Sequence, residues 1–514
     1  MSEINKGQLA GEITRLALLA RDDEFKYYSE IKIAAKKFGI PLSVIKKHVS
    51  ESIIYMKQNH ETSEPSEKST LGDDKTEDDV ARAIGEKFAG RILFDHTQQR
   101  WFVWIDDRWK LDEVDIVFSL IRDFCQQERI SSLDNHKGKK LGKIAFISNV
   151  ERASRSESKL AVTHQIWDKD PWLLGIPGGV IDLRTGNTLS ASPHYYISRQ
   201  TKVAPAPPGT PAPLWEKFLY EATGGDYEFI AFLQRLYGYI LTGVTIEEIF
   251  AFLYGGGGNG KGTFLRPGTQ ILHEYAASIP IEVFTASGRI NLEYYRAVMQ
   301  GKRLITTIEP ESGAEWSEST IKEISGNETE LSARNPYGRP FQFMPTCKII
   351  AVGNHAPKLK GRSPAMERRL RVCPFDRVPS TPDQTLKDRL IDEYPAIFRW
   401  MLDGCLEWQR IGLGTCKAVS EASEHYFTAM DAFGEWLNER CILDPSLKIS
   451  PNVLLSDFNA WAKASGRDQI SSVAFAEIVD RYPNLRRERT KKHRFVCGVG
   501  LINQDSGGNW DRGD

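Results

Sequence analysis

Short apolar runs alternate with longer helical patterns through the middle of the chain. The run 249–254 ends at four glycines, and the segment that follows Lys261 has a helical pattern. Two further apolar runs, 304–308 and 347–353, come later in the chain. Strands that alternate with helices in this way are typical of an α/β domain with a parallel sheet.

The pattern differs on both sides of this α/β block. Residues 81–201 start with a helical pattern and continue as alternating apolar and aromatic residues across short turns, which predicts a strand meander and then a helix at 114–126. The tail, 431–503, has two helical patterns followed by two basic strands, an order typical of a winged helix. We therefore expect six segments: a small helical segment (1–57), a disordered linker (58–79), an α+β domain (80–203), a Pro-rich spacer (204–213), an α/β domain with a helical lid (214–415) and a winged-helix-like domain (425–505).

The N-terminal segment has the spacing of a helix-turn-helix. Small residues at Ala34 and Ala35 precede a turn at Gly39, and Ser43 is placed to cap a second helix. Small helical domains show the same spacing for packing alone, so DNA contact and packing both remain open. The linker that follows is acidic and has no aromatic residues, which predicts a flexible segment.

Composition indicates a soluble protein of several domains. The chain has 514 residues, of which 41% are hydrophobic, enough for several separate cores. It contains no apolar run of about 18 residues and no signal-peptide pattern, so we expect a cytoplasmic protein without a membrane partner. Seven cysteines without a CxxC pattern predict buried reduced thiols. The net charge of −1 leaves any nucleic-acid binding to local basic patches.

The glycine-rich stretch after the first strand predicts a phosphate-binding loop. Glycines let the backbone wrap closely around a polyphosphate, the helix N-terminus adds partial positive charge, and a lysine reaches the β- and γ-phosphates. The loop departs from the usual pattern at one position, because Gly262 stands where a Ser or Thr hydroxyl normally ligates Mg²⁺, and Thr263 comes one residue later. The predicted cradle for ATP comprises Gly255, Gly256, Gly257, Gly258, Asn259, Gly260, Lys261, Gly262 and Thr263.

Polar residues at the ends of the next strands complete a predicted nucleotide site. Glu309 and Glu311 follow the strand 304–308 two residues apart, so one carboxylate could hold Mg²⁺ while the other polarises the attacking water. Asn354 follows the third strand, where its side chain could sense the γ-phosphate or its water. Arg368 and Arg369 fit an arginine finger offered to a neighbouring subunit, with a surface ion pair as the alternative.

Two basic segments are candidates for DNA contact. A predicted hairpin carries Arg334, Tyr337 and Arg339 near its tip, a combination that suits backbone and base contacts with a single strand. The final strands carry a basic run in which Glu488 is the one opposing charge. The residues of this run that we expect at DNA phosphates are Arg487, Arg489, Lys491 and Lys492.

The ordered motifs GGGGNGKGTF, LITTIEPE, SARNPYGRPFQF, KIIAVGNHAPKLKG and ERRLRVCPF resemble those of superfamily 3 helicases. The closest resemblance is to the phage and plasmid primase-helicase family, which is related to the poxvirus primase-helicase. It implies an AAA-like P-loop core preceded by a helicase-associated α+β domain. It also implies a homo-hexameric ring that hydrolyses ATP with Mg²⁺ between subunits and translocates 3′-to-5′ on single-stranded DNA.

The resemblance leads us to expect a replicative helicase that unwinds forked DNA in the cytoplasm of a bacterial host, for a phage or plasmid. No polymerising primase site is visible, so a separate primase or polymerase is an expected partner. Two other classes of function remain open. One is an origin-binding or regulatory ATPase that is switched by nucleotide and does not unwind, and the other is a structural partner with a decayed site.

Overall fold

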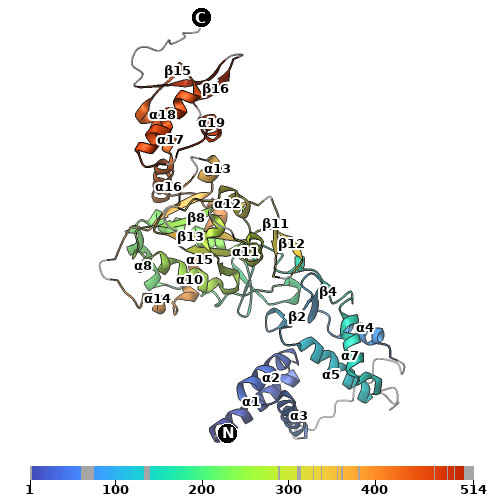
Figure 1. Ribbon diagram of the computed structural model, residues 1–514. Helices are drawn as coiled ribbons and strands as arrows, with labels where there is room; N and C mark the ends of the chain where they lie inside the picture. The colour runs from blue at the N-terminus through green and yellow to red at the C-terminus, as the bar shows by residue number, and fades with distance from the viewer. Residues whose placement is uncertain are drawn as a thin grey trace. The chain divides into compact units, whose positions relative to one another are not determined.

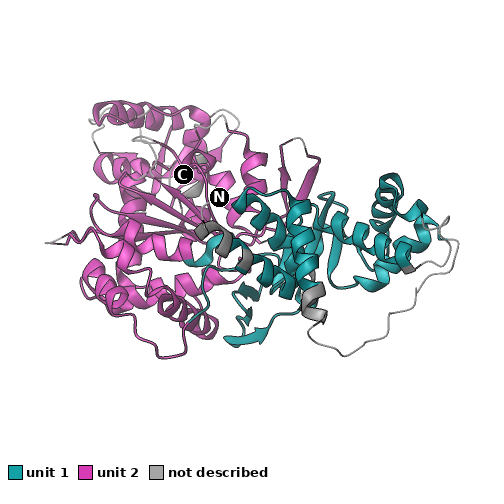
Figure 2. Ribbon diagram, turned by 90° about the horizontal axis from the view of Figure 1, so that it is seen from below, with its two compact units in different colours: residues 1–205, 271–275 teal, residues 206–270, 276–514 magenta. Residues whose placement is uncertain are grey.

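The computed structural model describes residues 3–22, 24–58, 75–131, 139–286, 290–308, 314–327, 329–336, 338–355, 357–359, 363–379, 382–467, 469–482, 484–490 and 493–502. The chain divides into two compact units, which Figure 2 colours separately. Unit 1 comprises residues 1–205 and 271–275, and unit 2 comprises 206–270 and 276–514. The structure is a mixed α/β protein with several sheets.

Unit 1 combines N-terminal helices with two small sheets (Figure 1). Strands β1 to β3 form the predicted antiparallel meander, and β4 pairs with β1 in parallel. The second sheet is the antiparallel set β5-β6-β7. The elements of unit 1 are α1 (Glu3–Asp22), α2 (Glu24–Phe38), α3 (Leu42–Gln58), α4 (Glu77–Lys87), β1 (Ile92–Asp95), β2 (Arg100–Ile105), β3 (Arg108–Leu111), α5 (Ile116–Ser131), α7 (Ile144–Ser154), β4 (Ala161–Val162), η1 (His164–Ile166), β5 (Leu173–Ile176), β6 (Gly179–Asp182), β7 (Asn187–Ser190), η2 (Pro193–Tyr195) and η3 (His273–Tyr275).

The N-terminal helices share one hydrophobic core with the α+β block. Leu16, Ile31 and Ile45 are almost fully buried in the same cluster as residues of α4, α5 and α7. Lys46, on the predicted DNA-contact helix, lies 3.5 Å from the carboxylate of Asp123 on α5. This favours packing over DNA contact for this face of α3, because the lysine already pairs with a carboxylate of the same unit.

Two details of the N-terminal prediction need correction. Helix α3 begins at Leu42, so Ser43 lies inside its first turn and does not cap it. The predicted linker 58–79 is too long at both ends, because α3 includes Gln58 and the chain from 75 onward is structured. Thr76 caps α4 through the backbone N–H of Asp79, and the remainder of the predicted linker, 59–74, lies outside the described residues.

Unit 2 is built on a five-stranded parallel sheet with the order β14-β8-β13-β10-β9. Alternate residues of the central strands face the two sides, and Phe250, Phe252 and Ile349 pack on one side against Trp316 and Tyr426. The apolar runs 249–254, 304–308 and 347–353 form strands β8, β10 and β13, with bounds that agree within one residue. Its elements are α8 (Pro213–Thr223), α9 (Tyr227–Leu241), β8 (Phe250–Tyr254), α10 (Lys261–Leu272), β9 (Ala276–Ser278), η4 (Ile281–Phe284), α11 (Leu292–Met299), β10 (Leu304–Ile308), α12 (Glu318–Ser325), β11 (Leu331–Arg334), β12 (Pro340–Phe343), β13 (Lys348–Gly353), α13 (Pro364–Glu367), β14 (Leu370–Pro374), α14 (Leu386–Arg389), α15 (Tyr394–Ile411) and α16 (Lys417–Met430).

A basic side chain is buried at the start of the central strand β13. Lys348 is 2% exposed, and its ammonium donates hydrogen bonds to the backbone oxygen (2.5 Å) and the hydroxyl (3.1 Å) of Thr242. The same ammonium lies 4.4 Å from the centre of the Tyr239 ring. Hydrogen bonds and an aromatic face thus take the place of water around this group.

The C-terminal part of unit 2 has its own hydrophobic core, which includes Phe433, Trp436 and Phe458. Its helices and its three-stranded antiparallel sheet, in the order β15-β17-β16, alternate along the chain. The elements are α17 (Ala432–Arg440), β15 (Cys441–Ile449), α18 (Pro451–Ala464), α19 (Ser472–Arg481), β16 (Arg486–Arg489) and β17 (Arg494–Leu501).

The cysteine prediction is confirmed, because all seven cysteines are buried and none forms a disulfide. Burial raises the pKa of Cys125 and of Cys347 to about 12, so both thiols stay protonated near neutral pH. None of the described helices is both long and apolar enough to cross a membrane.

Candidate nucleotide-binding site

The glycine-rich loop lies at one edge of the parallel sheet of unit 2. Strand β8 ends at Tyr254, the loop 255–260 follows, and α10 begins at Lys261. Because β8, β13 and β14 run in parallel, their carboxyl ends meet at this same edge. Ligands of open α/β sheets bind at the carboxyl ends of the strands, and a helix N-terminus favours anions.

The ammonium of Lys261 is held by three oxygen atoms at this edge. It donates to the backbone oxygen of Gly255 (2.6 Å) and to the side-chain oxygens of Asn259 (2.9 Å) and Asn354 (2.9 Å). Lys261 is only 6% exposed. The structure therefore brings together two residues that are 93 positions apart in the sequence. A phosphate would compete with neutral oxygens for this ammonium, and a charge-assisted contact to phosphate is the stronger one.

The loop can approach the next strand closely because residue 255 has no side chain. A Cβ atom on Gly255 would lie 1.8 Å from the backbone oxygen of Phe375, which follows β14. A Cβ atom on Gly256, in contrast, would meet nothing within 4 Å. Gly257 and Gly258 have φ values of 100° and 67°, which glycine adopts without strain. The loop shape is thus specified by glycine at these positions.

Asn259 braces the loop from inside. Its side-chain nitrogen donates to the backbone oxygen of Phe375, while its side-chain oxygen accepts from Lys261. The N–H of Phe375 in turn donates to the backbone oxygen of Tyr254 at 2.7 Å. The sequence analysis placed Asn259 in the cradle but missed this bracing role and Phe375. The close approach of Gly255 to Phe375 joins segments about 120 residues apart, and no local pattern signals it.

The predicted metal ligands are only partly within the described residues. Gly262 and Thr263 are the second and third residues of α10, and Thr263 is half-buried. Glu309 and Glu311 lie outside the described residues, directly after β10 ends at Ile308. Across the described part of the chain, no group of three or more His, Cys, Asp or Glu side chains is placed to hold a metal ion.

The two predicted finger arginines differ in their surroundings. Arg369 is buried, and its guanidinium donates to Glu248 at 2.5 Å and to the backbone oxygen of Ala365 at 3.2 Å. The Arg368 side chain is 64% exposed and lies 3.5 Å from the same carboxylate. Arg369 is thus buried and paired within its own chain, whereas Arg368 is exposed, and the choice of a finger between them stays a prediction.

The predicted hairpin is present as β11 and β12, with Arg334 opposite Pro340 at its outer end. Nε of Arg334 donates to the backbone oxygen of Gly338 at 3.1 Å, so this arginine closes the turn. Arg339 is exposed. Tyr337 lies outside the described residues.

The basic C-terminal strands are more strongly paired than predicted. Arg487 forms a two-armed ion pair with Asp480 of α19, and Glu488 lies 3.0 Å from Lys448 of β15. Glu488 is the one opposing charge within the run itself, and the fold adds Asp480 of α19 beside it. Arg489 is exposed and has no ion pair among the described residues, whereas Lys491 and Lys492 lie outside them.

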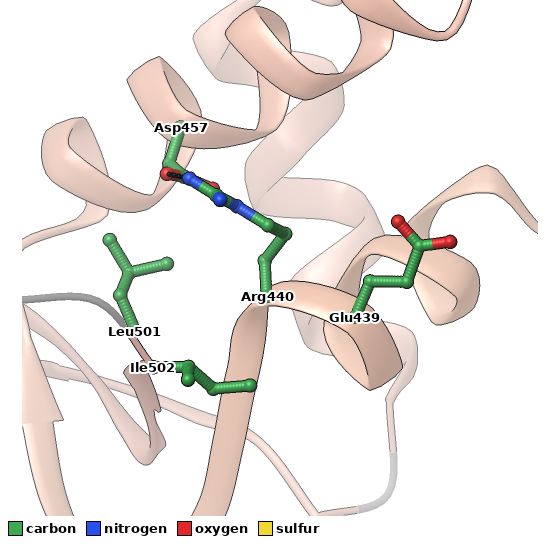
Figure 3. A pocket seen from close by; sticks show the side chains of 5 residues that line it. All are labelled: Glu439, Arg440, Asp457, Leu501 and Ile502. Atoms are coloured by element: carbon green, nitrogen blue, oxygen red, sulfur yellow. Dashed lines mark hydrogen bonds and ion pairs between the residues drawn. The ribbon is translucent and has the colours of Figure 1, made fainter.

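A small pocket in the same region has its charges satisfied internally (Figure 3). Its lining includes Arg440 and Asp457, whose side chains lie 2.8 Å apart. Trp436 also donates to Asp457, and Trp461 donates to Glu439 at the pocket wall. Charged groups that are already paired leave little to recognise a polar ligand, so the loop at the sheet edge remains the candidate site.

Two family models match separate parts of the chain. Residues 81–224 match the model described as D5 N terminal like. Residues 253–369, which include the glycine-rich loop, β10, the hairpin and β13, match a family of unknown function (DUF5906). Together with the viral relatives described next, these matches support a phage or viral primase-helicase.

Two viral relatives share limited identity with this chain. "Putative helicase L207/L206" of Acanthamoeba polyphaga mimivirus is 23% identical over 323 residues, which are 58% of this chain and 34% of the relative. "Putative helicase 022R" of Frog virus 3 (isolate Goorha) is 25% identical over 242 residues, or 43% of this chain and 25% of the relative. The chain thus matches about a third of one relative's length and a quarter of the other's.

Two solved apo structures of the NrS-1 C-terminal region are also similar. Each is 11% identical in sequence to this chain, and each alignment covers 83% of this chain and all of the other. The TM-scores are 0.44 and 0.48.

Proposed function

We propose that the protein is an ATP-dependent DNA helicase of phage or plasmid replication, with an AAA-like motor of the superfamily 3 type. The observation that carries the proposal is the contact of Lys261 with Asn354 across neighbouring strands, directly beside the glycine-rich loop. A phosphate-binding lysine next to a polar residue at the end of a second strand suits phosphoryl transfer, in which positioning and charge stabilisation supply most of the catalysis. The strand order β14-β8-β13-β10-β9 supports the same class of motor.

Each site residue has a proposed part in ATP hydrolysis. The loop 255–260 and the N-terminus of α10 would bind the phosphates, and Lys261 would bridge the β- and γ-phosphates as charge develops. Asn354 would orient the attacking water or sense the γ-phosphate. Thr263 and Glu309 would hold Mg²⁺, which neutralises phosphate charge when bound, and Glu311 would polarise the water.

Hydrolysis would occur between subunits of a homo-hexameric ring. Arg368, exposed beside the buried Arg369–Glu248 pair, is the finger offered to the neighbouring subunit. The hairpin β11–β12 would contact single-stranded DNA inside the ring, and the C-terminal helices and wing would contact duplex DNA. A separate primase or polymerase would work with this motor in the host cytoplasm.

The experiment that tests this proposal compares unwinding of a forked duplex by wild-type protein and by Arg339→Ala, with ATP and Mg²⁺. Arg339 is exposed at the hairpin, so its removal should leave folding and basal ATPase intact. We expect loss of strand displacement and of the stimulation of hydrolysis by single-stranded DNA, because the phosphate contact that couples hydrolysis to the strand is gone.

Arg410→Ala is the matched control, since Arg410 is exposed on α15 and its ion-pair partner among the described residues is Glu407, three residues earlier. It should unwind like the wild type. If wild-type protein shows DNA-stimulated ATPase without unwinding on forks of either polarity, the protein is a nucleotide-switched DNA-binding ATPase instead.

A further inference from the structure

Gly262 has no side chain, and the ammonium of Lys387 lies close to it. A Cβ atom built on Gly262 would lie 3.6 Å from the ammonium of Lys387. Lys387 belongs to α14, 125 residues further along the chain, and its side chain is exposed. No hydrogen bond or ion pair of Lys387 occurs with any residue that the structure describes. The ammonium therefore lies where the side chain that normally follows the phosphate-loop lysine would project.

Residues next to Lys387 contact two other helices of unit 2, α10 and α8. Next to it, Asp388 accepts from Arg266 of α10 at 3.1 Å, which ties α14 to the helix that starts at the loop. Leu390 is 1% exposed, and Glu393 accepts from the backbone N–H groups of Leu214 (3.0 Å) and Trp215 (2.9 Å) at the start of α8. These contacts connect the segment that bears Lys387 to α10 and to the start of α8.

We propose that Lys387 is a second phosphate-binding residue of the nucleotide site, which supplies from α14 a positive charge where Gly262 supplies no metal ligand. This inference rests on the proposed function, since it needs a nucleotide at the loop. An ammonium beside the second residue of α10 would neutralise phosphate charge at the loop, which is also what Mg²⁺ would supply there. Nucleotide binding should therefore depend less on Mg²⁺ than in sites that have the Ser or Thr hydroxyl.

The test measures the affinity of the full-length protein for a fluorescent ADP, with Mg²⁺ and with EDTA in its place. Lys387→Ala should weaken ADP binding about tenfold in EDTA and less with Mg²⁺, because a lost charge-assisted contact matters most when no metal shares the phosphate charge. Lys387→Arg should restore binding, since it keeps a cation on the same backbone. Lys417→Ala, which removes an exposed lysine on α16, is the matched control and should bind like the wild type.

A second pair of variants tests the exchange between the lysine and the hydroxyl. A Cβ atom at 262 makes ordinary contact with Lys387, so Gly262→Ser fits the site. In the double variant Gly262→Ser/Lys387→Ala, ADP binding should recover with Mg²⁺ but not in EDTA, because the serine hydroxyl supplies a metal ligand and not a charge. ADP binding would then depend on Mg²⁺ and no longer on the Lys387 ammonium.

The possible outcomes separate this inference from the proposed function. If Lys387→Ala binds ADP like the wild type in both buffers while Lys261→Ala does not bind, Lys387 is a solvated surface lysine and the inference is wrong. If Lys387→Arg fails to restore binding, the loss in the alanine variant comes from the fold of the segment, which also contradicts it. Absence of nucleotide binding by the wild type itself would overturn the proposed function and this inference together.

Discussion

The loop at Lys261 and the basic strand β16 were both predicted to bind phosphates, but their basic side chains have different partners in the structure. At the loop, the Lys261 ammonium donates to neutral oxygens of Gly255, Asn259 and Asn354, which a nucleotide phosphate can replace. On β16, Arg487 already has a carboxylate partner in Asp480. A glycine pattern fixes the backbone around its own lysine, whereas a run of charges says nothing about the partners that the fold brings to it.

The largest effect that tests this comparison is expected at the loop itself. Lys261→Ala should lower ATP turnover by about 10²–10³-fold or more, because a charge aimed at the developing transition state is removed. Steady-state hydrolysis with Lys417→Ala as control measures it. Unchanged turnover in a preparation free of contaminating ATPase would remove the phosphate-loop assignment and with it the contrast to β16.

The second prediction concerns the backbone that holds the loop. Gly255→Ala should destabilise unit 2 by about 1–3 kcal/mol, because its Cβ would overlap the backbone oxygen of Phe375. Gly256→Ala, one residue later, should stay within about 0.5 kcal/mol of the wild type, since its Cβ meets open space. Thermal unfolding of the two variants measures the difference. Equal stability of the pair would show that the loop is not held against Phe375.

The smallest effects are expected on β16. If this strand contacts duplex DNA, Arg489→Ala should weaken binding by about threefold to tenfold. The slope of log K against log salt concentration should fall in magnitude by about 1, the value for one lost phosphate contact. Arg487→Ala should change affinity less, because this arginine is occupied by Asp480. Asp480→Ala should strengthen binding by releasing it. Titrations at several salt concentrations measure all three, and equal losses for both arginines would mean that the ion pair opens on DNA.

Much of unit 2 could be predicted from the sequence because its signals are local. The strand 304–308 and the loop with Lys261 follow from apolar runs and glycine spacing over a few residues. The position of Asn354 beside Lys261 follows from one further rule, that parallel strands end at the same edge.

The remainder depended on contacts between distant segments. The burial of Arg369 requires Glu248, and the position of Lys387 requires the Arg266–Asp388 pair, neither of which any spacing in the sequence reveals. The N-terminal helices also share a core with the α+β block, although an acidic, polar stretch separates them in the sequence. Burial and ion pairing are set by the assembled fold, and a pattern of residue types does not determine them.

The buried Lys348 makes the folding of unit 2 a proton-linked reaction. Burial, and then the nearby Arg303, lowers the pKa of Lys348 well below its ordinary value of 10.5. From its pKa in the folded protein up to about pH 10.5, the unfolded chain binds a proton on this lysine that the folded chain does not, so stability rises with pH across that window. Lys348→Met should flatten the rise in Tm on the alkaline side, below about pH 10.5. If Tm rises with pH as steeply in the variant as in the wild type, another group takes up the proton on unfolding.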